Sequence, residues 1–349
     1  MMQRSWVKLT RSAMQSGAKS VGHALAKAMS STSTPARKSK AAPRARAVAA
    51  PQGDWIAGVA LGIGGSAGAR RFRLYRPPQL QSGERLPLLV MLHGCGQNAN
   101  TFAASTRMNQ TAQRERFFVL YPEQDRLANV QGCWNWFDTC SGRADREAAL
   151  IISAIEQVCL LHAVDRERVA VAGLSAGASM AALLVTRSPA RFKAVVMHSG
   201  IAPGTANSGL SALGAMRGRR AAAPLVPPGV RALGAVTMPR VATAWPPLLV
   251  IHGTADAVVS PHNARAAAQV WADAAGARAG VPRAVQRGQR YPMSVTDFKR
   301  RGDTVATLVQ VGSLAHAWSG GAASQPHSDA RGPDASRMVW AFAAKQFRP

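Results

Sequence analysis

The stretch RVAVAGLSAG, residues 168–177, is a short apolar run that leads into a serine between glycines, and a small-residue helical pattern follows it. This arrangement is typical of a nucleophile elbow, a sharp strand-to-helix turn that holds a serine in a strained backbone conformation. Gly173 and Gly177 lack side chains, so they allow the strand and the helix to approach closely. We therefore predict that Ser175 is a nucleophile at the edge of a sheet. The rest of the chain must then supply a base, an acid and donors for an oxyanion.

Length and charge predict one folded domain with a basic tail. The chain has 349 residues, 47% of them hydrophobic, which is enough for one substantial core over residues 51–349. Residues 1–50 contain ten Lys or Arg and no Asp or Glu, and the remaining 33 basic and 17 acidic residues leave +16 of the net charge of +26. A solvated basic surface explains this charge, and contact with an anionic surface is the alternative. The sequence has no aromatic-interleaved basic stripe that would indicate a nucleic-acid partner.

The tail divides into two parts. Residues 1–30 are compatible with a basic amphipathic helix that would lie on a granule or an anionic membrane, or with an unstructured tail. Residues 30–51 are rich in Ser, Pro, Ala and basic residues, which predicts a disordered linker. Charged residues interrupt every apolar run near the N-terminus, so we expect no clear secretory signal. No run of eighteen apolar residues occurs, so we expect no transmembrane segment.

The chain has four cysteines, Cys95, Cys133, Cys140 and Cys159, without any C-x-x-C spacing, so we expect no metal site. Cys133 and Cys140 are close enough in sequence to bridge across a loop. Four cysteines allow three full pairings, and the sequence does not choose among these or none. Cys159 lies on an apolar helical stretch, which predicts a buried thiol.

Strand-like and helical segments alternate along the chain. Continuous Leu, Val and Met runs such as Leu86–Leu92 are typical of a parallel sheet that is covered on both faces. Strands are predicted at Ile56–Ile63, Arg71–Arg76, Leu86–Leu92, Val119–Tyr121, Val169–Gly173, Ala194–Met197, Leu248–Ile251 and Val305–Val311. Helices are predicted at Thr101–Arg116, Asp145–His162, Ala176–Arg187, Asn263–Ala275 and Asp334–Phe347. The alternation predicts an α/β fold with a mostly parallel, doubly wound sheet in a three-layer sandwich.

The turn His93–Gln97 directly follows the Leu86–Leu92 run, and glycines flank its central residue, Cys95. The backbone N–H of Cys95 can therefore point into a site at the carboxyl edge of the sheet. The N–H of Ala176, directly after the predicted nucleophile, is the natural second donor. These two donors predict an oxyanion hole, and a simple strand-ending turn is the alternative.

Candidates for the acid and the base follow later strands. Asp256 lies a few residues beyond the buried run Leu248–Ile251, and His316 lies shortly after Val305–Val311. The order serine, acid, histidine along the chain is that of α/β-hydrolases. We therefore predict that Asp256 orients His316 and that His316 is the base for Ser175. His252, at the end of a strand, is interpreted as structural.

Three tryptophans, Trp134, Trp136 and Trp318, occur in loop-like segments near these strand ends. Aromatic side chains in such loops can line an apolar substrate cleft, whereas burial in the core is the ordinary alternative. We predict that these tryptophans contribute to substrate binding.

Together the segments resemble the poly(3-hydroxybutyrate) depolymerase family of esterases, which also includes relatives acting on feruloyl and acetyl esters. The resemblance extends from about Trp55 to the C-terminus. The motifs that carry it are LHGCGQ at 92–97, CWNWF at 133–137, GLSAGASM at 173–180, IHGTAD at 251–256, HAWSGG at 316–321 and GPDASR at 332–337. It implies an α/β-hydrolase fold, a triad of Ser175, Asp256 and His316, oxyanion donors at Cys95 and Ala176, and no cofactor. It also implies an extracellular or periplasmic location, with the cytoplasm as the alternative.

The leading hypothesis is a serine esterase that hydrolyses poly- or oligo(3-hydroxybutyrate)-like polyesters through an acyl-enzyme. Among enzymes, the alternative is a carboxylesterase that acts on feruloyl esters or acetyl-xylan. A non-catalytic protein that binds a granule or membrane surface through its basic N-terminus is the alternative of another class. No separate substrate-binding domain is recognised near the C-terminus, which favours short or amorphous esters.

Overall fold

The structure is a computed structural model that describes residues 52–62, 68–222 and 244–348. The predictions made for residues 1–50 lie outside this part of the chain.

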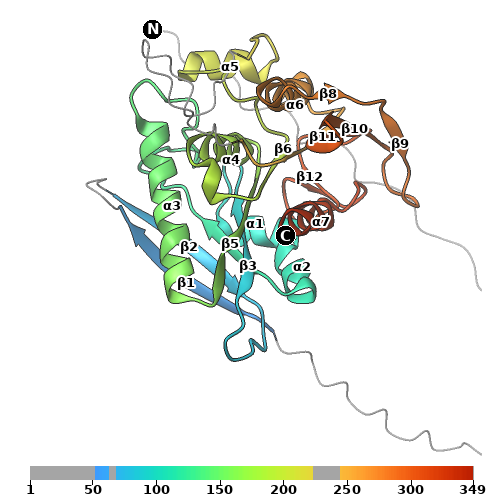
Figure 1. The fold of residues 1–349 in the computed structure, drawn as a ribbon. Coiled ribbons are helices and arrows are strands. Elements are labelled where there is room, and N and C mark those ends of the chain that lie inside the picture. The colour runs from blue at the N-terminus through green and yellow to red at the C-terminus, as the bar shows by residue number, and fades with distance from the viewer. Residues whose placement is uncertain (1–51, 63–67, 223–243, 349) are drawn as a thin grey trace, which may run out of the picture. The chain divides into compact units, whose positions relative to one another are not determined.

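Eleven of the described strands form one mixed sheet with a parallel centre (Figure 1). Its order is β1-β2-β4-β3-β5-β6-β7-β11-β10-β8, with β9 paired to β10. The parallel strands are β3 (Leu86–Leu92), β4 (Phe118–Pro122), β5 (Val164–Leu174), β6 (Ala194–His198), β7 (Leu248–Gly253) and β11 (Asp303–Val311). The antiparallel strands are β1 (Asp54–Leu61) and β2 (Ala69–Arg76) at one edge, and β8 (Arg278–Ala279), β9 (Arg283–Val285) and β10 (Met293–Arg300) at the other. A short separate pair is formed by β12 (Trp318–Ser319) and β13 (Ser328–Asp329).

Helices cover both faces of the sheet. One hydrophobic cluster joins the sheet to α3 (Arg143–Leu161), α4 (Ala176–Arg187), α5 (Gly209–Met216) and α6 (His262–Ala275). A second cluster joins the other face to α1 (Ala99–Thr106), α2 (Met108–Glu115) and α7 (Ala335–Gln346). A short 3-10 turn, η1, spans Pro189–Arg191. The predicted doubly wound α/β sandwich is therefore confirmed.

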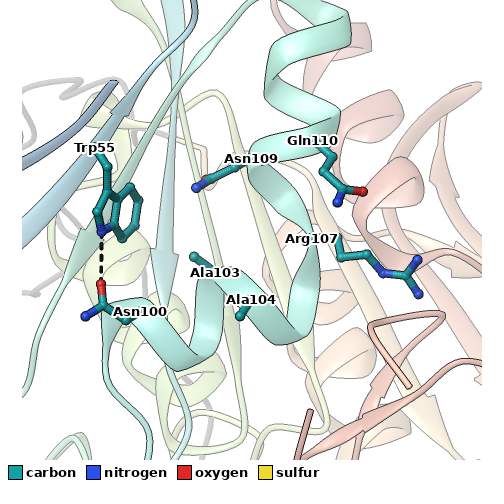
Figure 2. Close-up of a pocket in the computed structure, with 7 residues that line it drawn as sticks. All are labelled: Trp55, Asn100, Ala103, Ala104, Arg107, Asn109 and Gln110. Carbon is teal, nitrogen blue, oxygen red and sulfur yellow. Dashed lines mark hydrogen bonds between the residues drawn. The ribbon is translucent and has the colours of Figure 1, made fainter. Parts of the chain in front are cut away.

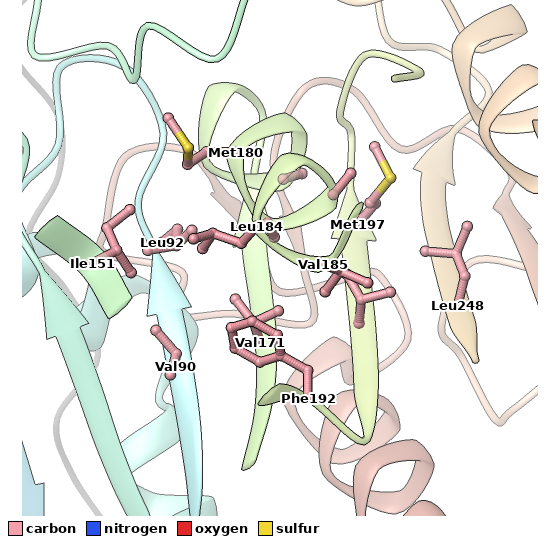
Figure 3. Close-up of a cluster of buried hydrophobic side chains, with 14 of the residues drawn as sticks. Val90, Leu92, Ile151, Val171, Met180, Leu184, Val185, Phe192, Met197 and Leu248 are labelled. Atoms are coloured by element: carbon pink, nitrogen blue, oxygen red, sulfur yellow. The ribbon is translucent and has the colours of Figure 1, made fainter. Parts of the chain in front are cut away.

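Strand β3 shows why an uninterrupted apolar run is needed at the centre. Its side chains alternate between the faces: Val90 and Leu92 contact the cluster under α3 and α4 (Figure 3), whereas Leu89 and Met91 belong to the other cluster. All four side chains are fully buried. Both alternating sets must be apolar because neither face of the strand meets water.

One segment that was predicted as a single helix forms two helices. The segment 101–116 was expected to be a single helix, but it is divided into α1 and α2 at Arg107, whose φ is +54°. A left-handed residue ends the α1 hydrogen-bond ladder. The Arg107 guanidinium then reaches the carbonyl of Gly321, a contact far away in sequence.

The structure also contains elements that were not predicted, among them α5 and β10. Strand β10 pairs antiparallel with β11 across a tight turn at residues 301–302, where both Arg301 and Gly302 have positive φ. Among the helices of the described residues, none is long and apolar enough to span a membrane.

Candidate active site

The turn between β5 and α4 has the geometry of an elbow. Ser175 has φ +55° and ψ −120°, a conformation that is strained for a residue with a Cβ atom. A Cβ on Gly173 would lie 2.3 Å from the backbone carbonyl of Gly177, so only glycine permits this approach of strand and helix. The close approach expected at Gly173 and Gly177 is therefore present, and it leaves Ser175 partly exposed.

A chain of hydrogen bonds joins three strand ends. The Ser175 hydroxyl lies 3.0 Å from His316 Nε2, and His316 Nδ1 lies 2.7 Å from Asp256 Oδ2. Since Asp256 is a carboxylate, Nδ1–H donates to it and Nε2 is left to accept the serine proton. This arrangement matches that of a nucleophile, a base and an orienting acid.

Asp256 is fixed by more than His316. Its Oδ1 accepts the N–H groups of Val258 and Val259 at 3.0 and 2.8 Å, and its Oδ2 also lies 3.2 Å from His252 Nε2. Burial by itself raises the pKa of this carboxyl, but the hydrogen bonds from His252, His316 and Val259 outweigh it. The pKa of Asp256 therefore lies well below its ordinary value, and the group is charged at neutral pH.

The turn after β3 lies against the elbow. A Cβ on Gly177 would lie 2.1 Å from the Leu92 carbonyl oxygen, and one on Gly94 would lie 3.6 Å from that of Leu174. Within the described residues, neither the Cys95 N–H nor the Ala176 N–H donates to a protein acceptor. The structure thus places two unused donors on neighbouring segments beside Ser175.

A disulfide holds this turn. Cys95 bonds Cys133, which lies in the loop between β4 and α3. The bridge between Cys133 and Cys140 that the spacing allowed is absent, since Cys140 is a free, exposed thiol. The predicted buried thiol of Cys159 is confirmed.

The prediction that the tryptophans line a substrate cleft is wrong for two of them. Trp134 and Trp318 are fully buried, and their indole N–H groups donate to the His93 carbonyl and to Ser336 Oγ. Trp136 is only 7% exposed and packs edge-on against Phe137. Because Trp134 and Trp318 are fully buried and their indole N–H groups are hydrogen-bonded, they pack in the interior beneath the site and do not line its surface.

Two further histidines beside the triad were not predicted to contribute. His252 contacts the buried Asp256, as described above, and donates to the Val259 carbonyl at 3.0 Å. The carbonyl of His198 accepts the Ser175 N–H, and its imidazole accepts the Ser319 N–H and stacks on Trp318. Each lies at the end of a buried strand, the only sequence signal that could have identified it.

A separate surface hollow of about 400 Å³ lies between β1, α1 and α2 (Figure 2). Its lining residues are Trp55, Asn100, Ala103, Ala104, Arg107, Asn109 and Gln110. Trp55 forms one wall and donates from its indole N–H to Asn100 Oδ1 at 2.9 Å. The hollow contains none of the triad residues. Across the described residues, no grouping of three or more His, Cys, Asp or Glu suits a metal ion.

Comparison with known families adds to this geometry. The family described as "Esterase PHB depolymerase" matches residues 70–286, which is more than half of the chain. The chain belongs to this esterase family. The match includes Cys95, Ser175 and Asp256, and it ends before His316. The family resemblance expected from the motifs is thereby confirmed.

Similar proteins include polyester depolymerases, feruloyl esterases and acetylxylan esterases. Poly(3-hydroxyalkanoate) depolymerase C of Paucimonas lemoignei is 36% identical over 104 residues, 30% of this chain and 25% of that protein. The alignment thus spans about a quarter of the depolymerase. Feruloyl esterase B of Thermothelomyces thermophilus is 27% identical over 220 residues, 58% of this chain and 69% of that protein.

Solved structures support the fold. The acetyl xylan esterase from Aspergillus awamori superposes with a TM-score of 0.52 at 18% sequence identity, covering 71% of this chain and 89% of that one. At this level of identity the similarity identifies the fold alone, which is that of the α/β-hydrolases.

The buried histidines predict that this protein loses stability in mild acid. Burial lowers the pKa of His93 to about 4, with a smaller contribution from the charge of Arg70. Burial, followed by the charges of His252 and His316, lowers the pKa of His198 to about 3. In the unfolded chain a histidine has a pKa of about 6.5. Below that pH the two side chains are protonated in the unfolded chain but remain neutral in the folded protein, so the free energy of unfolding falls as the pH falls.

Below pH 6.5 each histidine lowers the free energy of unfolding by about 1.4 kcal/mol for every pH unit. The two together should therefore lower it by about 5 kcal/mol between pH 7 and pH 4.5. Urea unfolding at these two pH values measures this loss. His93→Gln should remove about half of the pH-dependent part, whereas the exposed His327→Gln should leave it unchanged. Equal stability of the wild type at both pH values would contradict the prediction.

Proposed function

We propose that this protein is a serine esterase in which Ser175, His316 and Asp256 are the catalytic triad and the Cys95 and Ala176 N–H groups are the oxyanion donors. The observation that carries the proposal is the hydrogen-bond chain from Ser175 Oγ through His316 to Asp256, at 3.0 and 2.7 Å, beside a strained elbow. Family membership over residues 70–286 supports it.

The first step acylates the enzyme. Ser175 Oγ attacks the ester carbonyl carbon while His316 Nε2 takes the hydroxyl proton, and the carbonyl oxygen becomes an oxyanion. The Cys95 and Ala176 N–H groups stabilise that negative charge. When the tetrahedral intermediate collapses, the bond from carbon to the alcohol oxygen breaks, and the alcohol leaves with the proton from His316.

The second step returns the enzyme to its starting state. His316 takes a proton from water, and the resulting hydroxide attacks the acyl carbon of the Ser175 ester. The second oxyanion forms on the same donors. Collapse releases the carboxylic acid, and Ser175 Oγ recovers its proton from His316. The charged Asp256 stabilises the imidazolium in both steps without itself being protonated.

Exposed aliphatic side chains at the carboxyl edge of the sheet favour an apolar, uncharged substrate. They occur in the loops after β4 and β7 and on α5, which follows β6. They are Leu127, Val130, Leu210, Leu213 and Val258, which are 51–94% exposed. Substrates of open α/β sheets bind at this edge. We assign poly- or oligo(3-hydroxybutyrate)-like esters as the substrate class, supported by the depolymerase relative at 36% identity.

Feruloyl or acetyl-xylan esters are the second candidate class. The observation that favours them is the longer alignment with feruloyl esterase B, which covers 58% of this chain. As for location, the Cys95–Cys133 disulfide suits an oxidising compartment, so we assign the protein to the cell exterior or periplasm.

A substrate panel tests the proposal. Purified protein is assayed with hydroxybutyrate oligomers, amorphous polyhydroxybutyrate, feruloyl esters and acetylated xylan, and with a fluorophosphonate probe that labels activated serines. We expect kcat/KM for the hydroxybutyrate oligomers to exceed the other values at least about tenfold, together with labelling at Ser175. The reverse order would support the feruloyl or acetyl-xylan class. No hydrolysis and no labelling would support a non-catalytic surface-binding protein.

A further inference from the structure

Glu147, in the first turns of α3, is a carboxylate that is only 3% exposed and is not part of the triad. Its Oε1 accepts hydrogen bonds from Gln124 Nε2 at 2.7 Å and from Asn135 Nδ2 at 2.6 Å. Its Oε2 accepts the Asn135 backbone N–H at 2.9 Å. A buried charge lowers stability unless it is paired and hydrogen-bonded. The three hydrogen bonds to Glu147 meet part of that requirement, and they tie its carboxylate to Gln124 and Asn135.

The positive charge that balances Glu147 is also buried. Arg70 on β2 is 2% exposed, and its guanidinium donates to Gln124 Oε1 at 2.6 Å and lies 5.3 Å from the centre of the Trp134 ring. The Gln124 amide therefore connects the two charges, since its oxygen accepts from Arg70 and its nitrogen donates to Glu147. Such a network is rigid because each member has its orientation set by the next.

The same network holds both sides of the Cys95 turn. Gln124 donates from its backbone N–H to His93 Nε2 at 3.1 Å and from Nε2 to the Cys133 carbonyl at 3.0 Å. Trp134 Nε1 donates to the His93 carbonyl at 3.0 Å. Cys133 in turn is joined covalently to Cys95. Residues 133–135, which Glu147 holds through Asn135, thus carry the connections to His93 and Cys95.

Further hydrogen bonds hold the backbone of the turn, one of them to the β4–α3 loop. The Gly94 N–H donates to Gln97 Oε1, and the Gly96 N–H donates to the Gln131 carbonyl, both at 2.9 Å. Gln131 belongs to the same β4–α3 loop that Glu147 anchors. If residues 133–135 moved, the disulfide and the Gln131 contact would move the Cys95 N–H with them.

We propose that Glu147 is a positioning residue that fixes the Cys95 N–H toward the oxyanion, and this inference rests on the proposed esterase function. An oxyanion donor acts chiefly in the transition state, where the charge develops. Displacing it lowers kcat and leaves substrate binding nearly unchanged, because ground-state binding does not depend on that donor.

Glu147→Gln tests the proposal. Glutamine keeps the shape but has one acceptor oxygen in place of two, so an N–H of Asn135 or Gln124 then faces an NH₂ group. We expect kcat for a p-nitrophenyl ester to fall about 30-fold, with KM within about threefold of the wild type. The affinity of a trifluoromethyl ketone, which forms an oxyanion adduct with the serine, should fall by the same factor. Active-site titration with a fluorophosphonate normalises each rate to competent enzyme.

The matched control is Glu156→Gln, on the same helix. Glu156 is partly exposed and pairs with Arg166 and Arg191, and none of these contacts involves the Cys95 turn or the triad. Its replacement should lower stability and leave kcat and inhibitor affinity unchanged. If Glu147→Gln does not fold, Trp134→Phe removes the hydrogen bond to the His93 carbonyl and should lower kcat in the same selective way.

Two failures are distinguishable. If the wild type is labelled at Ser175 but Glu147→Gln keeps wild-type kcat, KM and inhibitor affinity, the role of Glu147 is overturned and the esterase function stands. An equal loss of kcat in the Glu156→Gln control would also overturn it, since the effect would then be general to α3. If the wild type is neither labelled nor active, the proposed function itself fails.

Discussion

Replacing Ser175 by alanine is expected to lower kcat/KM for p-nitrophenyl butyrate about 10⁵-fold, because the attacking oxygen is lost while the oxyanion donors remain. Alanine has the same Cβ as serine, so the strain at φ +55° is unchanged and the fold should persist. End-point assays at high enzyme concentration measure the residual kcat/KM, and thermal unfolding shows whether the fold persists.

Ser179→Ala is the control for this variant. Ser179 lies one turn further along α4, and its hydroxyl accepts the Ile201 N–H at 2.9 Å. Its loss should cost about 1 kcal/mol of stability and leave activity near that of the wild type. More than a few per cent of activity in Ser175→Ala protein free of wild type would rule out Ser175 as the nucleophile.

Asp256→Asn is expected to lower kcat about 10⁴-fold at neutral pH. The Asn oxygen can still accept the N–H groups of Val258 and Val259, so the loop keeps its shape. The Asn NH₂ group then faces His316 Nδ1, which forces the imidazole to carry its proton on Nε2. That tautomer cannot accept the Ser175 proton. The rate of fluorophosphonate labelling should fall together with kcat.

Asp273→Asn, on the exposed face of α6, makes the same chemical change at a carboxylate that accepts from Gln269, and it should leave kcat unchanged. A kcat for Asp256→Asn within tenfold of the wild type would show that this carboxylate does not set the tautomer of His316. The acid would then have to be sought elsewhere.

Local patterns predicted the central fold well. Strand β3 and helix α4 were predicted with their observed bounds, because an uninterrupted apolar run and a small-residue helix after an elbow are strong signals over short distances. The helix across Arg107 was predicted wrongly, since its left-handed backbone accompanies a contact with Gly321, more than two hundred residues away. Strand β10 was missed because its pattern is weak without its partner β11.

The site was predictable to the extent that topology places strand ends together. Ser175, Asp256 and His316 were proposed from their positions after three strands of the predicted sheet, and the structure brings them into one hydrogen-bonded chain. The roles given to Trp134 and Trp318 were wrong because a tryptophan in a loop has the same sequence signature whether it is buried or exposed. Only the surrounding acceptors, the His93 carbonyl and Ser336 Oγ, decide this.

The sequence by itself determined the elbow at Ser175, the parallel α/β sheet and the order of serine, acid and histidine, because each depends on neighbouring residues and on the rule that parallel strand ends share one edge. The tertiary structure alone decided that Cys95 pairs with Cys133 and that Glu147 lies beneath the resulting turn. Disulfide pairing and buried polar networks depend on which distant segments meet, and that is settled only when the helices pack against the sheet.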